Sequence, residues 1–442
     1  MRDALSFVMG LQWADVPEPV KARVKMALLD VIGVGAGGAG FRSAQIAAGF
    51  AADHLGGNAP LLFDDRHASA AGAAFAAAMS IDALDAHDGF NPAKGHIGAV
   101  LFASLWPCMK GMRGADLLTA LVAGYEFGAR ASMAQHGTVP DYHTSGSWGA
   151  VTGAAILSRL WSLDHNTARH AIGIAEYHGP RSQMMRGVDY PTMLKDGTAW
   201  GAMTAVSSAL LAQAGFTGAP AITVEQAPDY WADLGQRWFT LEQYFKPYPV
   251  CRWAQAPIEG VLALRRLHGL ASTDVTHIHV ATFHESIRLA TNNPKATDEA
   301  QYSTSFPCAV AMVRGDVGPA DIGDDALSDP EIVRLSNALT MSEDAEANAV
   351  FPLTRLAKVT LTLTDGRELS SDWMQPRWDH DAPPTKDEID AKFHAYADGP
   401  LGVDRATAIR EAVENLAETS TDALAALLSQ PIKRRTSGSS SE

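Results

Sequence analysis

The feature that most constrains the fold is a long stretch of small residues with helical spacing, from Val20 to about Ala214. Its larger apolar residues recur three or four positions apart, as at Val20, Val24 and Leu28, which indicates the buried face of a helix. Gly, Pro or His-containing turns separate the helical stretches. We expect residues 1–250 to be mostly helical, with helices at 44–55, 69–84, 97–107, 114–133, 147–160, 164–178 and 198–214.

Strand patterns begin only beyond residue 250. DVTHIHVATF at 274–283 alternates and is rich in β-branched residues, and AKVTLTLTDGRELS at 357–370 alternates up to an Asp-Gly turn that is typical of a hairpin. Helical spacing returns near the C-terminus. We therefore predict a mainly α protein, with a large helical domain over 1–250 that helices within 395–432 complete, a smaller α+β domain over 251–394, and a disordered Ser-rich tail over 433–442.

The charge balance limits the partners of this chain. Thirty-five Lys and Arg against 50 Asp and Glu give a net charge of −15, which opposes sequence-independent attraction to nucleic acid or to an anionic membrane. The cysteines form no CxxC motif, and charged residues interrupt the apolar start of the chain. We expect a cytoplasmic protein with no signal peptide or membrane span, and an anionic substrate would need a local cationic pocket.

Three glycines, Gly33, Gly35 and Gly38, match the GxGxxG pattern of dinucleotide-binding proteins. That function requires a strand before the first glycine and a phosphate-binding helix after the last one. Here a helical pattern leads into the glycines, so we interpret them as sites of close helix packing or helix termination.

One polar loop, LDAHDGFNPAKGHIGAV at residues 84–100, separates two apolar helical stretches. Asp85 and Asp88 can orient an imidazole, and His96 titrates near neutral pH, which suits proton transfer. Two other interpretations remain open from these residues alone. The loop is equally consistent with a solvated helix cap, and Asp85, His87 and Asp88 offer ligands for a divalent metal, although their spacing is not diagnostic.

Three further segments carry polar side chains that suit an anionic ligand. DYHTSGSWGA places Tyr142 and His143 just before a helix, whose N-terminal amides favour anions, although His143 alone is equally consistent with a buried structural histidine. The other two segments, at 178–202 and 246–257, supply cations that can neutralise carboxylates or can be ordinary surface and linker residues. The candidate cations are Arg181, Arg186, Lys195, Lys246 and Arg252.

Taken in order, these segments resemble the MmgE/PrpD family, which includes 2-methylcitrate dehydratase, cis-aconitate decarboxylase and iminodisuccinate epimerase. The resemblance also covers AQYSTSFPCAVA and VTLTLTDGRE, and therefore most of the chain. It implies a helical domain, a smaller α+β lid, an active site between them, a homodimer, and a di- or tricarboxylate substrate handled without cofactor or metal. The catalytic candidates are His96, His143, Lys195, Asp85 and Asp88; the substrate-binding candidates are Lys246, Arg252, Arg181, Arg186 and Tyr142.

This chain departs from the family pattern in the polar loop. Relatives that act as dehydratase or decarboxylase typically read DFDD, then Thr or a similar residue, and then HPS, whereas this chain reads DAHDG and HIG, so Gly89 replaces a potential hydroxyl contact. The departure favours an epimerase of an iminodisuccinate-like amino dicarboxylate, with His96 and His143 as acid and base. The alternatives are a 2-methylcitrate dehydratase-like hydro-lyase, a cis-aconitate decarboxylase-like lyase, and a non-catalytic polycarboxylate-binding or scaffold protein.

Overall fold

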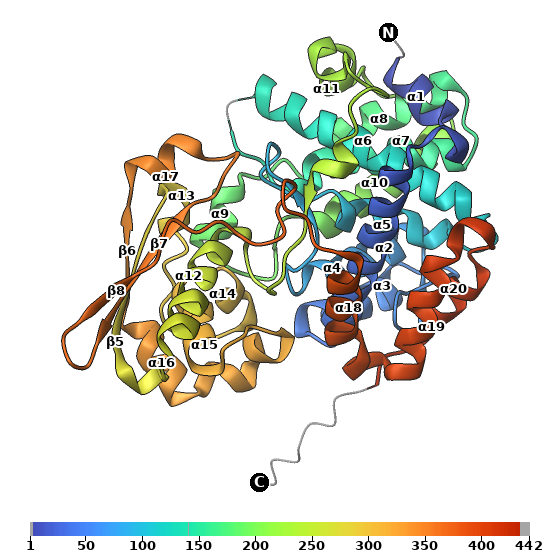
Figure 1. The fold of residues 1–442 in the computed structure, drawn as a ribbon. Coiled ribbons are helices and arrows are strands. Elements are labelled where there is room, and N and C mark those ends of the chain that lie inside the picture. Colours follow the sequence, from blue (N-terminus) through green and yellow to red (C-terminus); the bar gives the residue numbers. More distant parts are fainter. Residues whose placement is uncertain (1–2, 140, 434–442) are drawn as a thin grey trace.

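The computed structural model of this chain describes residues 3–139 and 141–433, so most of the Ser-rich tail predicted at 433–442 lies outside the described residues. The protein is mainly α, as predicted. Figure 1 shows a body of helices beside a smaller part that contains a twisted sheet and its own helices.

The helical body is built from the N-terminal half of the chain. α10 lies against α4, α7 and α8, and α6 lies against α7. Side-chain caps fix several helix starts, since Ser69 accepts from the Gly72 amide at α4 and Asp164 accepts from two amides at α8. All seven predicted helices are confirmed. The body contains α1 (Ala4–Gly10), α2 (Glu18–Gly38), α3 (Arg42–His54), α4 (Ala70–Asp82), α5 (Gly98–Leu105), α6 (Gly114–Thr138), α7 (Ser145–Leu160), α8 (His165–His178), α9 (Met184–Asp189), α10 (Thr198–Gln213) and α11 (Ile222–Glu225).

The glycines of the GxGxxG pattern lie inside α2, where they allow other helices to approach. A Cβ atom at Gly38 would lie 2.1 Å from the backbone oxygen of Ser80 in α4, and one at Gly33 would lie 2.8 Å from the ring of Phe393. These contacts confirm close helix packing as the role of the glycines. No strand precedes them among the described residues.

The smaller part contains a four-stranded sheet in the order β6-β5-β7-β8. β5 pairs with β6 in parallel and with β7 antiparallel, and β7 turns back into β8 through the predicted Asp-Gly hairpin. Burial alternates along β7, whose inner face packs on α12. Both predicted strand regions are confirmed, whereas β6 was not predicted. The elements are α12 (Arg252–His268), β5 (Val275–Thr282), α13 (His284–Ile287), α14 (Thr297–Gln301), α15 (Ser305–Arg314), α16 (Pro330–Asn337), β6 (Leu339–Glu343), α17 (Ala345–Val350), β7 (Ala357–Leu363) and β8 (Glu368–Ser370).

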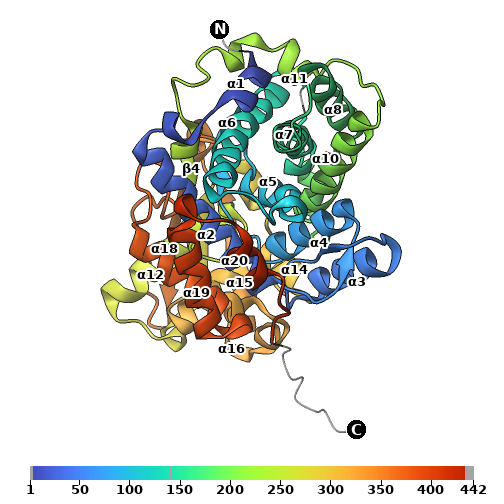
Figure 2. The same cartoon turned by 90° about the vertical axis from the view of Figure 1, so that its right-hand side faces the viewer.

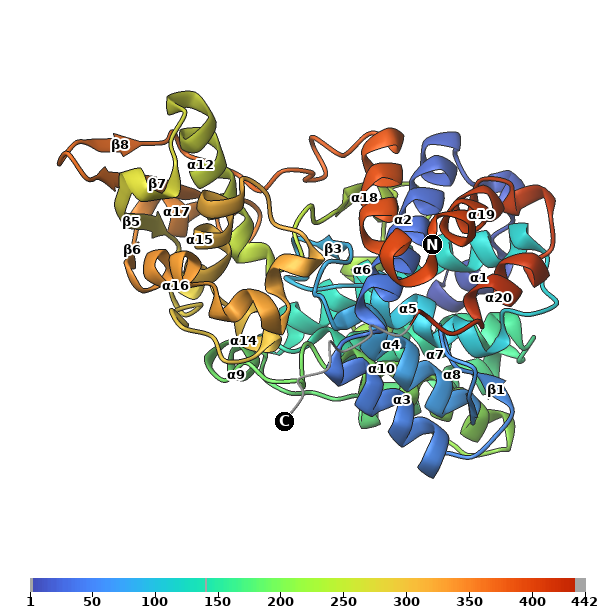
Figure 3. The ribbon, with the colours of Figure 1, turned by 90° about the horizontal axis from the view of Figure 1, so that it is seen from below.

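The C-terminal helices return to the helical body, as Figures 2 and 3 show. They are α18 (Lys386–Leu401), α19 (Val403–Glu414) and α20 (Asp422–Leu428). α18 packs on α2, and the Lys392 ammonium forms a buried ion pair with Asp30. The predicted boundary between 394 and 395 falls inside α18, so the segment that returns to the body begins earlier than expected, at Lys386.

No single helix in the described parts of the chain is both long and apolar enough to cross a membrane. Among the described helices, one pair, α2 and α3, meets that length and composition together, and a bend of 91° separates the two.

Candidate active site

A small pocket, partly open to solvent, lies where the helical body meets the sheet-bearing part. Figure 3 shows the loop with the short strand β3 (Gly89–Phe90) at this junction. Both parts of the molecule contribute side chains to the pocket walls. The lining residues are Asp85, Lys94, His96, Tyr142, Met184, Val188, Asp196, Tyr244, Cys251, Arg252, Trp253, Tyr302 and Arg355.

The polar loop predicted at 84–100 is buried and forms one wall of this pocket. β3 pairs antiparallel with β4 (Gln243–Tyr244), which places Gly89 opposite Tyr244. Asp85 and Lys94 in this loop have left-handed backbones, with φ of 46° and 53°, and Lys195 has φ of 52°. Non-glycine residues adopt this conformation at a cost, and such residues concentrate at functional sites.

His96 is held with one ring nitrogen toward Asp85. Its Nδ1 lies 2.7 Å from the backbone oxygen of Asp88, and because a carbonyl can only accept, Nδ1 carries the proton. Nε2 is then unprotonated and lies 3.6 Å from Asp85 Oδ1. Burial lowers the pKa of His96 well below its ordinary value, and the charges of Lys246 and His87 lower it further. His96 is therefore a neutral imidazole that can accept a proton at Nε2.

Two buried lysines, Lys195 and Lys246, form ion pairs and hydrogen bonds with polar groups near the pocket. The ammonium of Lys246 donates to the side chain of Asp85 and, at 2.6 Å, to its backbone oxygen. Lys195 lies 2.9 Å from Asp298 Oδ1 and donates to Gln301 Oε1. Lys246 therefore fixes the strained Asp85, whereas Lys195 lies behind the lining.

A buried ion pair lies behind His96. The pair consists of His87 and Asp82, with His87 Nε2 3.1 Å from Asp82 Oδ1. The ring of His87 packs edge-on against the ring of His96, and the ring centres are 4.5 Å apart. Burial lowers the pKa of His87, but the hydrogen bond and charge of Asp82 outweigh burial and raise it. Burial raises the pKa of Asp82, but the hydrogen bond and charge of His87 outweigh burial, so the pKa of Asp82 is lowered. The pair therefore places a positive charge beside His96, which keeps His96 neutral.

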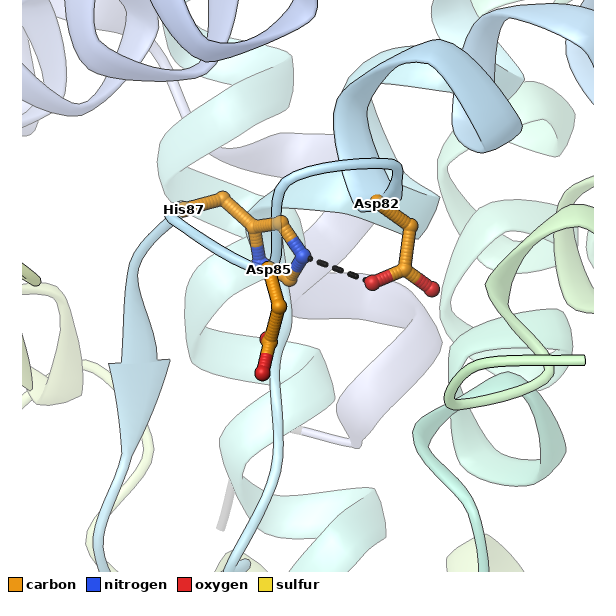
Figure 4. Close-up of side chains that lie close together, drawn as sticks. All are labelled: Asp82, Asp85 and His87. Carbon is orange, nitrogen blue, oxygen red and sulfur yellow. Dashed lines mark hydrogen bonds and ion pairs between the residues drawn. The ribbon is translucent and has the colours of Figure 1, made fainter. Parts of the chain in front are cut away.

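Asp82, Asp85 and His87 offer ligand atoms close enough together to hold a metal ion. Figure 4 shows Asp82 joined to His87, while the carboxylate of Asp85 points away from this pair. Thr198 also donates to Asp82 at 2.6 Å, and the Lys246 ammonium already neutralises Asp85. These partners satisfy the three side chains without an ion, so their arrangement fits a role in shaping the loop.

Asp196 links the Lys195 segment to the His96 loop. Its carboxylate accepts the Ser145 amide at 2.9 Å and the Ser145 hydroxyl, and that same hydroxyl accepts the His96 amide at 2.8 Å. Burial and the charge of Asp82 raise the pKa of Asp196 to about 7, despite the hydrogen bonds from Ser145. Asp196 is thus a buried carboxyl group that is partly protonated near neutral pH.

Several predicted site residues lie elsewhere. Asp88 does not line the pocket; burial raises its pKa to about 6, and it lies beside the Tyr125 hydroxyl. Arg181 lines a separate hollow, and Arg186 is exposed on α9. His143 is buried next to Tyr142 but does not line the pocket.

Arg252 and Tyr142 line the pocket as predicted but are already engaged. Arg252 donates to Asp379 at 2.9 Å and stacks at 4.0 Å over the Tyr244 ring, and the Tyr142 hydroxyl donates to the backbone oxygen of Lys94. These contacts make both side chains fixed walls of the pocket.

The sequence analysis missed nine of the 13 residues that line the pocket, and five of these nine carry charged or phenolic side chains. Lys94 belongs to the polar loop but was not selected, and Asp196, Tyr244 and Tyr302 lie in or beside segments that carry the family resemblance. Only Arg355, which lies between α17 and β7, gives no signal in the sequence, because the chain fold alone brings it to the pocket.

The departure at Gly89 has a structural explanation. A Cβ atom at residue 89 would lie 2.3 Å from the Tyr244 hydroxyl and 2.9 Å from His96 Nδ1. The Tyr244 hydroxyl therefore occupies the space that a side chain at residue 89 would need. In this chain the hydroxyl group nearest to position 89 is therefore that of Tyr244, on the opposite strand.

Comparison with known proteins places this architecture in a family. The N-terminal domain of MmgE/PrpD proteins matches residues 2–232, and their C-terminal domain matches residues 248–418. The chain belongs to the MmgE/PrpD family. Within this family, it is 25% identical over 460 residues to the cis-aconitate decarboxylase-like protein oryM of Aspergillus oryzae (strain ATCC 42149 / RIB 40), with 94% of each chain covered.

A second MmgE/PrpD relative is the cis-aconitate decarboxylase of Aspergillus terreus (strain NIH 2624 / FGSC A1156). It is 24% identical over 356 residues, which cover 73% of this chain and 72% of the relative. Both relatives are named for a decarboxylase, which is a lyase. The comparisons therefore favour the lyase alternative of the sequence analysis and give no support to the epimerase interpretation.

Proposed function

We propose that this MmgE/PrpD protein is a lyase that acts on a small polycarboxylate, with His96 moving the proton at a carbon next to a carboxylate. The observation that carries the proposal is the state of His96, a neutral imidazole with Nδ1 bound to a backbone oxygen and Nε2 unprotonated at the pocket. The fixed tautomer leaves Nε2 unprotonated near neutral pH, which is the state that a general base needs.

In the hydro-lyase form of this reaction, Nε2 of His96 takes a proton from the carbon beside a carboxylate. The electron pair forms a carbon–carbon double bond, and the hydroxyl group on the next carbon leaves as water. Asp196 supplies the proton for that water, since its carboxyl is partly protonated near neutral pH and lines the same pocket. The cations of the pocket offset the negative charge that develops on the carboxylate.

The names of the relatives favour decarboxylation as a second candidate. There the bond to a carboxylate breaks, carbon dioxide leaves, and the remaining electron pair spreads onto a neighbouring unsaturated carboxylate. The protonated carboxyl group of Asp196, or His96 in its protonated form, then delivers a proton to that carbon system. Both forms use the same His96, Asp196 and cationic walls, and no cofactor enters either one.

Two substrates distinguish these candidates. The enzyme is incubated separately with 2-methylcitrate and with cis-aconitate, and products are followed by NMR and carbon dioxide release. An alkene from 2-methylcitrate supports the hydro-lyase, and carbon dioxide from cis-aconitate supports the decarboxylase. The His96→Asn variant should lose either activity while keeping its unfolding midpoint; full activity in that variant would refute the proposal.

We also propose that the protein acts as a homodimer through an apolar surface on α8 to α10. Tyr177, Leu194 and Trp200 are exposed by 79%, 73% and 51%, and Trp200 continues through Phe75 to the exposed Phe50 of α3. Trp200, Phe75 and Phe50 form a continuous row of rings, and exposed apolar patches on proteins mark interaction sites. Light scattering after chromatography tests this, and a Trp200→Glu variant should shift the mass from two chains to one.

A further inference from the structure

Two cations in the pocket wall, Lys94 and Arg355, have no carboxylate within ion-pair distance among the described residues. We propose that they bind one carboxylate of the substrate between them, remote from the carbon at which His96 moves the proton. The inference rests on the proposed lyase function and assigns the residues that recognise the part of the substrate that does not react.

Arg355 is buried, with 2% of its surface exposed, and its hydrogen bonding is incomplete. One terminal nitrogen donates to Asn91 Oδ1 and to the backbone oxygen of Pro352, but Nε has no acceptor among the described residues. The guanidinium also lies 5.8 Å from the centre of the Tyr244 ring. A buried guanidinium with an unused donor is costly unless an acceptor arrives.

Lys94 lines the same pocket from the polar loop of the helical body. Its ammonium lies 4.5 Å from the centre of the Tyr142 ring and forms no hydrogen bond or ion pair with the residues that the structure describes. Burial lowers its pKa; the charge of Glu285 opposes this effect, and the charge of Arg355 adds to it. Both cations line the same pocket, so their positive charges oppose each other there, and Lys94 has a left-handed backbone.

The other charges that line the pocket are already compensated. Asp85 pairs with Lys246, and Arg252 pairs with Asp379. Burial raises the pKa of Asp196 to about 7, so that its negative charge is incomplete near neutral pH. The pocket therefore keeps an excess of positive charge at Lys94 and Arg355. An anion between the two cations would offset their repulsion and could accept a hydrogen bond from Arg355 Nε.

The same carboxylate would connect the two parts of the molecule. Asn91 already contacts both sides of the junction, since its side-chain nitrogen donates to Asp379 at 2.9 Å and its oxygen accepts from Arg355. Lys94 lies in the same turn as Asn91, because its backbone amide donates to the Asn91 backbone oxygen at 3.0 Å. Ligand binding at Lys94 and Arg355 should therefore add a contact between the sheet-bearing part and the helical body.

Titration calorimetry with unreactive ligands tests this inference separately from turnover. The probes are propane-1,2,3-tricarboxylate, succinate and the monocarboxylate butyrate, and the proteins are wild type, Lys94→Gln and Arg355→Gln. The matched control is Lys110→Gln, which removes the same charge from an exposed lysine outside the pocket. Lys94→Gln breaks no side-chain hydrogen bond among the described residues, so it should fold even where Arg355→Gln does not.

We expect each pocket variant to bind the tricarboxylate about 10- to 100-fold more weakly than wild type. The double variant should lose less than the product of the two single losses, because both cations hold one group. Equal affinity of Lys94→Gln and wild type, or absence of tricarboxylate binding by wild type, would overturn the inference. Tight binding without turnover of any substrate would instead contradict the proposed lyase function and leave this site standing.

Discussion

Replacing Asp196 by asparagine is expected to stabilise the protein above neutral pH. Burial raises the pKa of Asp196 from 3.8 to about 7, and Asp82 adds to this, although Ser145 donates two hydrogen bonds to the carboxylate. The folded protein therefore holds this proton more tightly than the unfolded chain does. Asparagine has nearly the shape of the protonated carboxyl group and does not ionise.

The sign and size of the effect follow from this difference in pKa. Between about pH 4 and pH 7 the folded state binds more protons at Asp196 than the unfolded state, so this residue lowers the free energy of unfolding as the pH rises. Once the pH exceeds the folded pKa, the full difference corresponds to about 4 kcal/mol. Wild type and Asp196→Asn should be similarly stable near pH 4, and the variant should gain up to that amount at higher pH.

Urea unfolding of both proteins over a pH series measures the effect. The difference between them cancels the titration of all other groups, provided that both have the same dependence on urea. Asp372→Asn, which changes an exposed carboxylate, is the matched control and should give a flat difference. A flat difference for Asp196→Asn, or a variant less stable than wild type at high pH, would refute the argument that burial keeps Asp196 protonated.

Four further substitutions test other parts of the site. Gly89→Thr should destabilise the protein by about 1–3 kcal/mol, because its Cβ atom would lie 2.3 Å from the Tyr244 hydroxyl; thermal unfolding measures this. Lys246→Met should cost about 3–5 kcal/mol in urea unfolding, because it leaves a buried carboxylate unpaired. His96→Asn should lower kcat about 10²- to 10⁴-fold, and His143→Asn much less, since His143 lies outside the pocket lining; steady-state kinetics compares them.

A different experimental result would contradict each of these predictions. An unchanged melting temperature for Gly89→Thr would mean that the Tyr244 ring moves aside freely. Lys21→Met, at a partly exposed ion pair with Glu18, is the control for Lys246→Met, and equal losses in the two would show that burial of the pair is unimportant. Equal losses of kcat in His96→Asn and His143→Asn would place His143 in the proton relay after all.

The fold was largely predictable because its signals are local. Apolar spacing, caps such as Ser69 and the Asp-Gly turn of the hairpin act over a few residues, so the seven helices and both strand regions could be derived from the sequence. β6 was missed because its five residues follow no clear alternation, and their pairing with β5 depends on a partner distant in the chain. The boundary inside α18 was misplaced because packing on α2, and not composition, decides where that helix belongs.

The sequence by itself determined the family, the helical character and the loop that carries Asp85 and His96. Only the tertiary structure decided which polar residues share one pocket. It brought Arg355 and Tyr244 to that loop, left His143 and Asp88 outside the pocket lining, and set the protonation of His96 and Asp196 through burial. The physical reason is that residue type fixes what a side chain can do, whereas desolvation and neighbouring charges, which depend on distant segments, fix what it does.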